Sequence, residues 1–329
     1  MPELPEVETI VNDLEHTIVG AKIVDFWENS PKQVVPTVEE VKQAVVGSTI
    51  VEVGRRAKLI VFKLNYYSSI RQQAGRSLKG SSRRVRLDSN NNIFLVIHLK
   101  MSGRLVLRKK GDLPDPYVRA IFYLNNNTSF WGGSASWRRR LQNRFWTSQN
   151  DDGTELELRF CDRRKFGYVR LFKDKQDLTK WTLEKLGPEP FSKEFTFSYL
   201  YKIFRHKNTN IKSALLDQSL IAGIGNIYAN EALFLAKIKP TRKAKSLKIK
   251  SLKSLKECII KVLKKGIKYR GSSSRDESYR DLYGELGNYQ NHFLVYEKKG
   301  KKCPNGCGGV IEYNKVNGRG TFWCPRCQK

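Results

Sequence analysis

The sequence lacks long apolar runs and any apolar segment near its N-terminus. No stretch reaches the roughly 18 consecutive apolar residues that a membrane-spanning helix needs, which argues against an integral membrane protein. The first residues, MPELPE, are acidic and lead into no apolar segment, so we expect no secretory signal peptide. Hydrophobic residues still make up 40% of the chain, which is enough to form a globular core.

Cysteine is scarce outside the C-terminal end. Four of the six cysteines lie within residues 303–329, in two close pairs. This distribution favours a metal site in a reducing compartment over a disulfide framework. Cys161 and Cys258 fall outside the pairs and are expected to be reduced core residues.

Acidic residues are too few to balance the basic ones. Lys and Arg number 61 against 32 Asp and Glu, which gives a formal net charge of +29. Such an excess repels itself in the folded state and favours a polyanionic partner, most simply a nucleic-acid backbone. Charge alone does not separate DNA from RNA, and a solubility role or an accessory of an RNA-rich particle are the alternatives.

The hydrophobic pattern divides the chain into a β-rich half, a helical half and a cysteine module. Val7, Ile10, Val11, Leu14 and Ile18 follow the spacing of an amphipathic helix. Runs typical of strands follow at residues 49–53, 59–64, 93–99, 105–107, 120–124, 155–160 and 168–172, and helical spacing returns from 195 to 267. We expect domains at 1–182, 183–295 and 296–329. Residues 65–92 and 126–153 have the composition of basic inserted loops, with extra DNA contact as the functional alternative.

The cysteine pairs have the spacing of a zinc site. Cys303 and Cys307 are separated by three residues, Cys324 and Cys327 by two, and a hairpin-length linker of sixteen joins the pairs. Four thiolates leave no coordination position open, so we expect one structural Zn²⁺ ion. Arg319 falls where the tip of the hairpin is expected, either as a phosphate clamp or as a solvated side chain.

The N-terminus is a candidate nucleophile. Removal of the initiator methionine would expose the secondary amine of Pro2, and an α-amine has a reference pKa of about 8. A partly neutral amine of this kind forms a Schiff base with a sugar carbon, and the adjacent Glu3 could transfer protons. On chemistry alone, an ordinary lead-in to the first helix explains the same residues.

Six segments, taken in order, resemble the formamidopyrimidine-DNA glycosylases, a family of oxidised-purine glycosylases related to endonuclease VIII. They are residues 1–8 (MPELPEVE), 55–58 (RRAK), 98–103 (HLKMSG), 162–167 (DRRKFG), 216–231 (LDQSLIAGIGNIYANE) and 287–296 (GNYQNHFLVY). The resemblance covers the chain except for the two insertions.

The resemblance implies an α+β fold: an N-terminal β-sandwich domain with an N-terminal helix, and a helical helix–two-turn–helix domain carrying a zinc-finger hairpin. It implies a bifunctional DNA glycosylase and AP lyase of base excision repair. Such an enzyme excises 8-oxoguanine and formamidopyrimidines through a Schiff base on the N-terminal proline and cleaves the strand by β,δ-elimination. The catalytic residues implied are Pro2, Glu3, Lys58 and Arg319, and the DNA-binding residues implied are Met101, Arg164, Phe166 and Asn226.

Several positions depart from the family pattern. Arg163 stands where the family has proline, and the first cysteine pair has one residue more than usual. Tyr117 lies where histidines are common, and Lys207 lies next to the position of a phosphate-binding lysine. We therefore expect Tyr117 and Lys207 to contact DNA in their place. Residues 271–283 resemble the loop that closes over the extruded base.

The expected partner is damaged double-stranded DNA, with no membrane and no nucleotide cofactor. We expect a monomer in the cytoplasm of a bacterium, associated with the nucleoid. Two alternatives stay open. One keeps the chemistry but prefers oxidised pyrimidines, as in endonuclease VIII, and the set Met101, Arg164 and Phe166 argues against it. The other is a catalytically silent DNA- or RNA-binding protein on the same scaffold.

Overall fold

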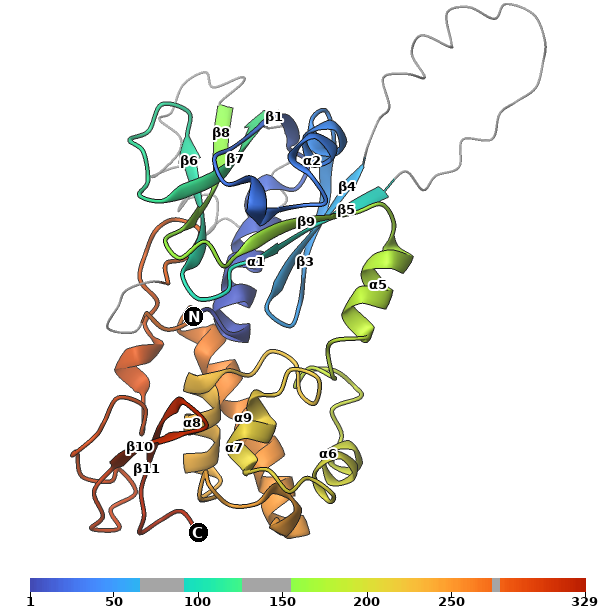
Figure 1. Ribbon diagram of the computed structural model, residues 1–329. Helices are drawn as coiled ribbons and strands as arrows, with labels where there is room; N and C mark the ends of the chain where they lie inside the picture. Colours follow the sequence, from blue (N-terminus) through green and yellow to red (C-terminus); the bar gives the residue numbers. More distant parts are fainter. Residues whose placement is uncertain (66–91, 126–154, 274–278) are drawn as a thin grey trace, which may run out of the picture.

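The computed structural model describes residues 1–65, 92–125, 155–273 and 279–329. Residues 66–91 and 126–153 of the two predicted insertions, and 274–278 of the predicted loop, lie outside the described residues. The strands of the first half lie above the helices of the second half in Figure 1, and the N-terminus lies between the two.

The first helix, α1 (Leu4–Ile18), confirms the predicted amphipathic pattern. It begins at Glu3 with a reciprocal capping box, in which the Glu3 side chain accepts from the backbone of Glu6 and the Glu6 side chain accepts from that of Glu3. Pro5 fits the first turn, where its missing N–H has no helical partner. The five apolar positions of the pattern are all buried, so the helix is held by its packing against the sheet.

Among the described residues, nine strands form one hydrogen-bonded sheet in the order β2-β9-β5-β4-β3-β1-β7-β8-β6. Its two parts, β2 to β3 and β1 to β6 in that order, meet where Lys22 of β1 pairs with Thr49 of β3, and backbone hydrogen bonds between residues 20–23 and 47–50 flank this pair. Both parts contribute side chains to one shared core together with α1, which is the layered packing expected of a sandwich. The strands are β1 (Lys22–Glu28), β2 (Val34–Val35), β3 (Thr49–Arg56), β4 (Leu59–Asn65), β5 (Asn92–His98), β6 (Gly103–Lys109), β7 (Val118–Asn125), β8 (Glu155–Asp162) and β9 (Tyr168–Phe172).

Three short elements complete the first half: the 3-10 turn η1 (Pro31–Gln33), α2 (Val38–Val45) and α5 (Lys175–Leu183). Strand β5 is buried on both faces. Leu95 and Ile97 join the main core, whereas Phe94 and Val96 pack with Leu178 of α5 in a separate cluster. A continuous apolar run is what a strand covered on both faces requires.

The second half is helical and surrounds one buried helix. Its helices are α6 (Phe197–Phe204), α7 (Ile211–Leu216), α8 (Asn226–Leu235) and α9 (Ile249–Lys268), with 3-10 turns η2 (Ala244–Ser246) and η3 (Tyr289–His292). Residues 227–234 of α8 are all buried, and α9, α7 and the C-terminal hairpin pack around that helix. The hairpin consists of β10 (Glu312–Val316) and β11 (Arg319–Trp323) and lies beside α8 (Figure 1).

None of the helices in the described parts of the chain is long and apolar enough to span a membrane.

Candidate active site and zinc centre

The Glu3 side chain lies at the N-terminus of α8. Its carboxylate accepts hydrogen bonds from the backbone N–H of Ile227 at 2.8 Å and of Tyr228 at 3.4 Å. The carboxylate is only 2% exposed, so the positive end of the helix and these two donors compensate for its burial. Burial raises the pKa of Glu3 above its ordinary value, while Lys58 opposes this shift.

The glycines before α8 make this contact possible. A Cβ atom on Gly225 would collide with the Glu3 carboxylate, and one on Gly223 would lie 2.6 Å from Leu4 Cδ1. Gly223 also has a φ of +97°, which favours glycine. The family resemblance implies that backbone amides of this turn bind phosphate together with Asn226. That expectation is wrong for Ile227 and Tyr228, because their amides donate to Glu3.

Lys58 approaches the same turn from the sheet. It follows β3, where Ala57 has a φ of 54°, and its ammonium donates to the carbonyl of Ile224 at 2.9 Å. The side chain is 7% exposed. Burial lowers the pKa of Lys58, and the neighbouring Glu3 opposes the shift. The sheet and the helical half therefore place a lysine and a carboxylate together beside the N-terminus.

A second buried lysine, Lys212 of α7, escaped the sequence analysis. Its ammonium donates to the carbonyl of Gly320 at 2.6 Å and to the hydroxyl of Thr321 at 2.8 Å, both in β11. Burial lowers the pKa of Lys212 to about 7, against the opposing charge of Glu3 and with a further contribution from Arg319. Lys212 thus fixes the hairpin against α7.

Arg319 lies at the hairpin tip, as predicted. The turn residues Asn317 and Gly318 both have positive φ, 47° and 74°, as a tight two-residue hairpin turn requires. Arg319 is exposed, and its charge acts on both Lys58 and Lys212. The guanidinium is therefore available to a ligand at the edge of the group formed by Glu3, Lys58 and Lys212.

Glu6 is a further buried carboxylate behind Glu3. It accepts from the Tyr228 hydroxyl and the Ser272 amide, each at 2.8 Å, and from the Glu3 amide at 2.8 Å. Burial, with a contribution from the negative charge of Glu3, raises the pKa of Glu6 to about 7. Glu6 thus links the start of α1 to α8 and to the segment after α9.

The residues expected to enter the DNA duplex lie on two neighbouring turns. Met101 precedes β6 and is 38% exposed, and Phe166 precedes β9 and is 57% exposed. Arg164, also exposed, places Nη1 3.4 Å from the Met101 sulfur. Both apolar side chains and the arginine are therefore accessible to a partner.

Asp162, at the end of β8, holds both turns together. One carboxylate oxygen accepts from the Ser102 hydroxyl at 2.6 Å and from the Arg164 amide at 3.2 Å. The other accepts from the Gly167 amide at 2.7 Å and from Gln33 Nε2 at 3.2 Å. Because Asp162 is 1% exposed, these four donors replace its hydration. The sequence places Asp162 at the start of the segment 162–167 but does not indicate this supporting role.

A cavity of about 550 Å³ opens next to these turns. Its lining includes Met1, Met101, Tyr117, Asp162 and Arg164. Tyr117 is 53% exposed, so its ring is accessible from this space. The chain terminus, the Met101 turn and the Arg164 turn therefore meet at one surface.

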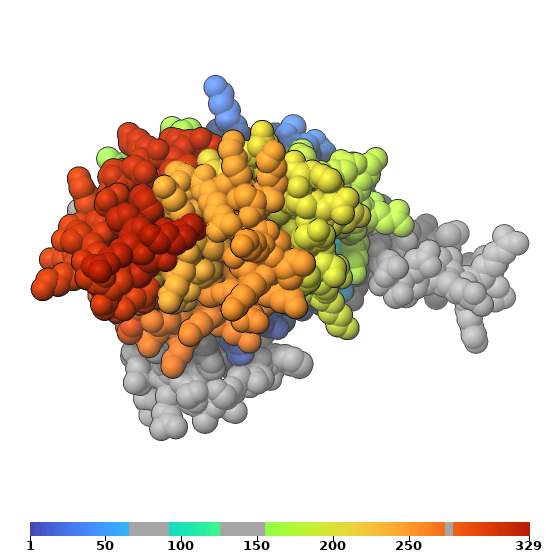
Figure 2. All heavy atoms as spheres, turned by 90° about the horizontal axis from the view of Figure 1, so that it is seen from below, coloured from blue at the N-terminus to red at the C-terminus, as the bar shows by residue number. Residues whose placement is uncertain are grey.

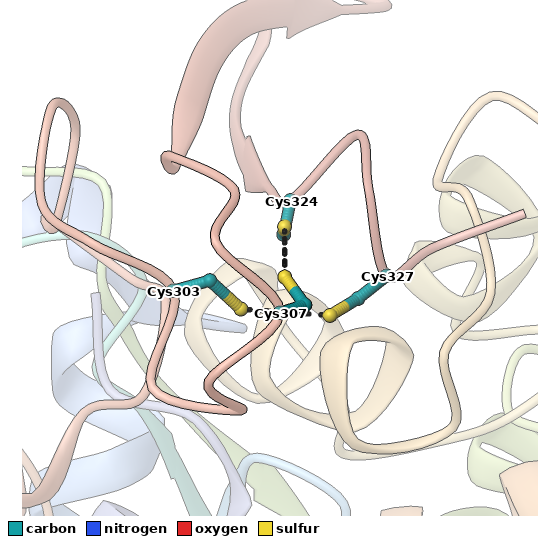
Figure 3. A group of neighbouring side chains, drawn as sticks. All are labelled: Cys303, Cys307, Cys324 and Cys327. Atoms are coloured by element: carbon teal, nitrogen blue, oxygen red, sulfur yellow. Dashed lines mark hydrogen bonds between the residues drawn. The ribbon is translucent and has the colours of Figure 1, made fainter.

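The four cysteines of the C-terminal module converge, as predicted (Figure 3). Their sulfur atoms all lie within 4.8 Å of one another, with Cys303 to Cys327 at 3.5 Å and Cys307 to Cys324 at 3.6 Å. Tetrahedral coordination at a Zn–S distance of about 2.3 Å places the sulfurs about 3.8 Å apart, so the group fits one structural zinc ion. The longer first spacing is accommodated at Gly306, which has a φ of +66°.

Two predicted DNA-binding residues, Lys207 and Asn226, are not joined to Glu3, Lys58 or Arg319 by any side-chain hydrogen bond among the described residues. Lys207 is exposed after α6, and its recorded contacts are to the backbone of Phe204 and Lys245. Asn226 begins α8 and is half-buried, with Nδ2 3.5 Å from the Tyr296 hydroxyl. Both residues stay predictions.

Three ranges of the chain match protein-family models. Residues 1–169 match the formamidopyrimidine-DNA glycosylase N-terminal domain and 186–278 its H2TH domain. Residues 300–329 match a zinc finger found in FPG and IleRS. Curated relatives named formamidopyrimidine-DNA glycosylase include one of Prochlorococcus marinus, 36% identical over 100% of both chains, and one of Syntrophomonas wolfei, 34% identical over 100% of both.

Solved structures of the same kind superpose over the whole chain. The Lactococcus lactis Fpg in complex with DNA containing an abasic site has a TM-score of 0.77 and 32% identity, covering 99% of each chain. MutM in complex with DNA containing carbocyclic 8-oxo-G has a TM-score of 0.76 and 32% identity, covering 100% of each. With matching sequence, zinc finger and fold along its full length, the chain belongs to the formamidopyrimidine-DNA glycosylase family.

Proposed function

We propose that the protein is a DNA glycosylase and AP lyase of base excision repair that removes oxidised purines from duplex DNA. The observation that carries the proposal is the meeting of Glu3 and Lys58 at the chain terminus, next to the cavity lined by Met101 and Arg164. Relatives crystallised with abasic-site and 8-oxo-G DNA support the choice of substrate.

The reaction begins after removal of Met1. The secondary amine of Pro2 attacks C1′ of the damaged nucleotide, and the base leaves with the electrons of the glycosidic bond and takes up the proton that the amine loses. Opening of the sugar requires a proton on O4′ as the C1′–O4′ bond breaks, and the result is an iminium ion on Pro2. Glu3 supplies that proton, since burial raises its pKa and so favours the acid form.

Strand cleavage follows from the iminium ion. Loss of a proton from C2′ expels the 3′ phosphate, and a second elimination expels the 5′ phosphate. Lys58, whose pKa is lowered by burial, assists the first step and contacts a phosphate. Arg319 binds the phosphate near the lesion and supports the second step, as its exposed position at the hairpin tip permits.

A lesion inside the base stack is out of reach of Pro2, so the nucleotide must leave the duplex. Met101 and Phe166 fill the space that it vacates, and Arg164 pairs with the orphaned cytosine. Their exposure supports this role. Asn226, Lys207 and Tyr117 contribute further contacts to the backbone.

The zinc module holds the hairpin and takes no part in bond making, because four thiolates complete its coordination. The proposed domains are 1–182, 183–295 and 296–329, a division that the matched ranges 1–169, 186–278 and 300–329 support. The enzyme acts as a monomer without a nucleotide cofactor, in the cytoplasm and on nucleoid DNA.

Borohydride trapping tests the proposal. The protein is incubated with duplexes carrying 8-oxoguanine opposite cytosine, dihydrouracil, or no lesion, and the reduced adduct is mapped by peptide mass spectrometry. We expect an adduct mainly on the 8-oxoguanine duplex, located at Pro2, and its loss in the Pro2→Gly variant with duplex binding retained.

Each other outcome has a distinct meaning. An adduct mapped to Lys58 or Lys212 would make the proposed nucleophile wrong. Preference for dihydrouracil would assign the activity of endonuclease VIII. Tight, salt-sensitive binding without any adduct would identify a silent DNA-binding protein.

A further inference from the structure

Helix α9 carries a stripe of lysines along its exposed face. Lys250, Lys253, Lys261, Lys264 and Lys268 are all exposed, and they follow the three- and four-residue spacing that aligns side chains on one side of a helix. Glu257 occupies the remaining position of the same line and is also exposed. At 1.5 Å per residue, the stripe is about 27 Å long.

The positive charge of this stripe is compensated only in part, because Glu257 is the one acidic residue of α9 and lies four residues from both Lys253 and Lys261. Residues 201–270 contain 18 Lys and Arg but only three acidic residues, and among those Glu231 is buried and Asp217 accepts from Ser219. Within the described chain, no ion pair is recorded for the five stripe lysines. Like charges at this spacing cost about 0.2–0.5 kcal/mol per pair in an isolated helix. Three like-charged pairs (Lys250–Lys253, Lys261–Lys264 and Lys264–Lys268) outnumber the two opposite-charged pairs of Glu257, so a bound anion would relieve the remaining repulsion.

The stripe faces away from the candidate active site. The opposite side of α9, including Leu255, Ile259 and Leu263, is buried in the helical core that α8 and α6 share. Leu4, next to Glu3, packs in this same core, so the candidate active site adjoins the buried side of α9 and the stripe lies on its other side. Figure 2 shows residues of α9, in orange, across the middle of the face opposite the first half of the chain, between the zinc finger in red and the α6–α7 region in yellow.

We propose that the α9 stripe binds a second segment of duplex DNA while the first occupies the active site. Duplex DNA presents one negative charge per about 1.7 Å of its axis, so a stripe of this length meets many phosphates. Two aromatic rings lie beside the stripe, Phe197 near Lys253 and Tyr269 near Lys268. Both rings already stack on protein side chains, Tyr201 and His292, which favours a duplex over single-stranded bases that need a free ring. The contact involves the backbone only and is independent of sequence.

A second contact would let the enzyme pass from one DNA segment to another without release into solution. This role rests on the proposed function, since it presumes that DNA occupies the active site. The physical claim concerns binding alone, so it can be measured without turnover.

The experiment first fills the active site of the full-length protein with a short duplex carrying a tetrahydrofuran abasic analogue. A longer, undamaged fluorescent duplex is then titrated, and its anisotropy is followed at several salt concentrations. We expect binding of the second duplex, with five phosphate contacts giving a slope of log K against log salt of up to about −4.5. A fourfold rise in salt would then weaken it by up to about 500-fold.

The test variant replaces all five stripe lysines by Gln, and we expect it to lose the second duplex. A charge-matched control replaces five exposed lysines of the first half by Gln, and we expect it to keep that duplex: Lys22, Lys32, Lys173, Lys175 and Lys180. Glu257→Lys completes the stripe and is expected to tighten binding. This third variant keeps the proposal falsifiable if the first fails to fold.

Three results would overturn the proposal: no second duplex bound, equal loss in the control variant, or displacement of the duplex by single-stranded RNA at lower concentration. Excision from a short 8-oxoguanine duplex is measured in parallel and should match wild type in all three variants. Loss of the second duplex with normal excision separates this proposal from the proposed function. Absence of excision in the wild type would instead refute the latter.

Discussion

Asp162→Asn tests whether the two exposed turns are held ready for DNA. The wild-type carboxylate accepts four hydrogen bonds, two per oxygen, from Ser102, Arg164, Gly167 and Gln33. Asparagine has nearly the same shape, but its NH₂ group must face one of these pairs of donors. Two donors then lose their acceptor, whichever way the amide turns.

The expected cost follows from burial. A hydrogen bond to a charged group is worth about 1.5–3 kcal/mol, and the Ser102 hydroxyl is free to rotate toward another acceptor. We therefore expect the free energy of unfolding to fall by about 2–4 kcal/mol. If about 2 kcal/mol of this loss destabilises the conformation of the Met101 and Arg164 turns that excision requires, excision slows by about 30-fold.

The assay compares two substrates in single-turnover kinetics. Excision of 8-oxoguanine requires the lesion to leave the stack, whereas cleavage at a preformed abasic site does not require base release. We expect the variant to lose rate on the first and to retain it on the second. Asp174→Asn is the matched control, because Asp174 is an exposed cap of α5 and Asn caps a helix equally well. Equal losses on both substrates, or a stability change below about 0.5 kcal/mol, would refute the reasoning.

Three further predictions concern buried charge and the metal. Because burial lowers the pKa of Lys212 from 10.5 to about 7, the unfolded chain binds more protons than the folded protein between about pH 7 and 10.5. Stability should thus rise with pH there by up to about 1.4 kcal/mol per unit, and Lys212→Met should remove that slope in denaturation curves. Glu6 gives the opposite pH dependence of stability. Because folding raises its pKa from 4.5 to about 7, stability should fall as the pH rises from about 4.5 to 7. Glu6→Gln should remove this pH dependence of stability. If the stability of the variant fell with pH as steeply as that of the wild type, the assignment of the raised pKa to Glu6 would be wrong. Chelation or Cys324→Ser should release zinc, measured by atomic spectroscopy, and weaken duplex binding through the loss of an ordered Arg319; unchanged affinity would exclude the hairpin from DNA binding.

Local periodicity was sufficient to predict most secondary structure. The predicted runs at 49–53, 59–64 and 93–99 became β3, β4 and β5, because buried strands need apolar side chains wherever the sheet is covered. The strand β1 was missed, since its sequence KIVDFWE exposes four of seven residues and so lacks a clean alternation. The zinc ligands were predictable because tetrahedral coordination constrains sequence spacing directly.

The support of the site was harder to predict, because it depends on contacts between distant segments. Lys212 lies in a helix of ordinary sequence, and only the packing of the hairpin against α7 buries its ammonium. Asp162 was read as part of a motif, yet its partner Ser102 lies 60 residues away. The Gly-x-Gly turn was assigned to phosphate, whereas Gly225 leaves room for Glu3. The local sequence pattern does not show whether a phosphate or a carboxylate of the protein accepts from the amides of a helix N-terminus.

Helix α8 connects the candidate active site with the zinc module. Its first turn donates to Glu3, and two buried polar residues further along hold the zinc module: Glu231 accepts from the amides of residues 294–296, and Asn230 accepts from Phe322. A helix buried on all sides has no structural need for such residues, since each costs free energy unless fully hydrogen-bonded. Their use here is geometric: one rigid element sets the position of the N-terminus relative to the Arg319 hairpin. Substituting either residue should therefore disturb strand cleavage and zinc retention together.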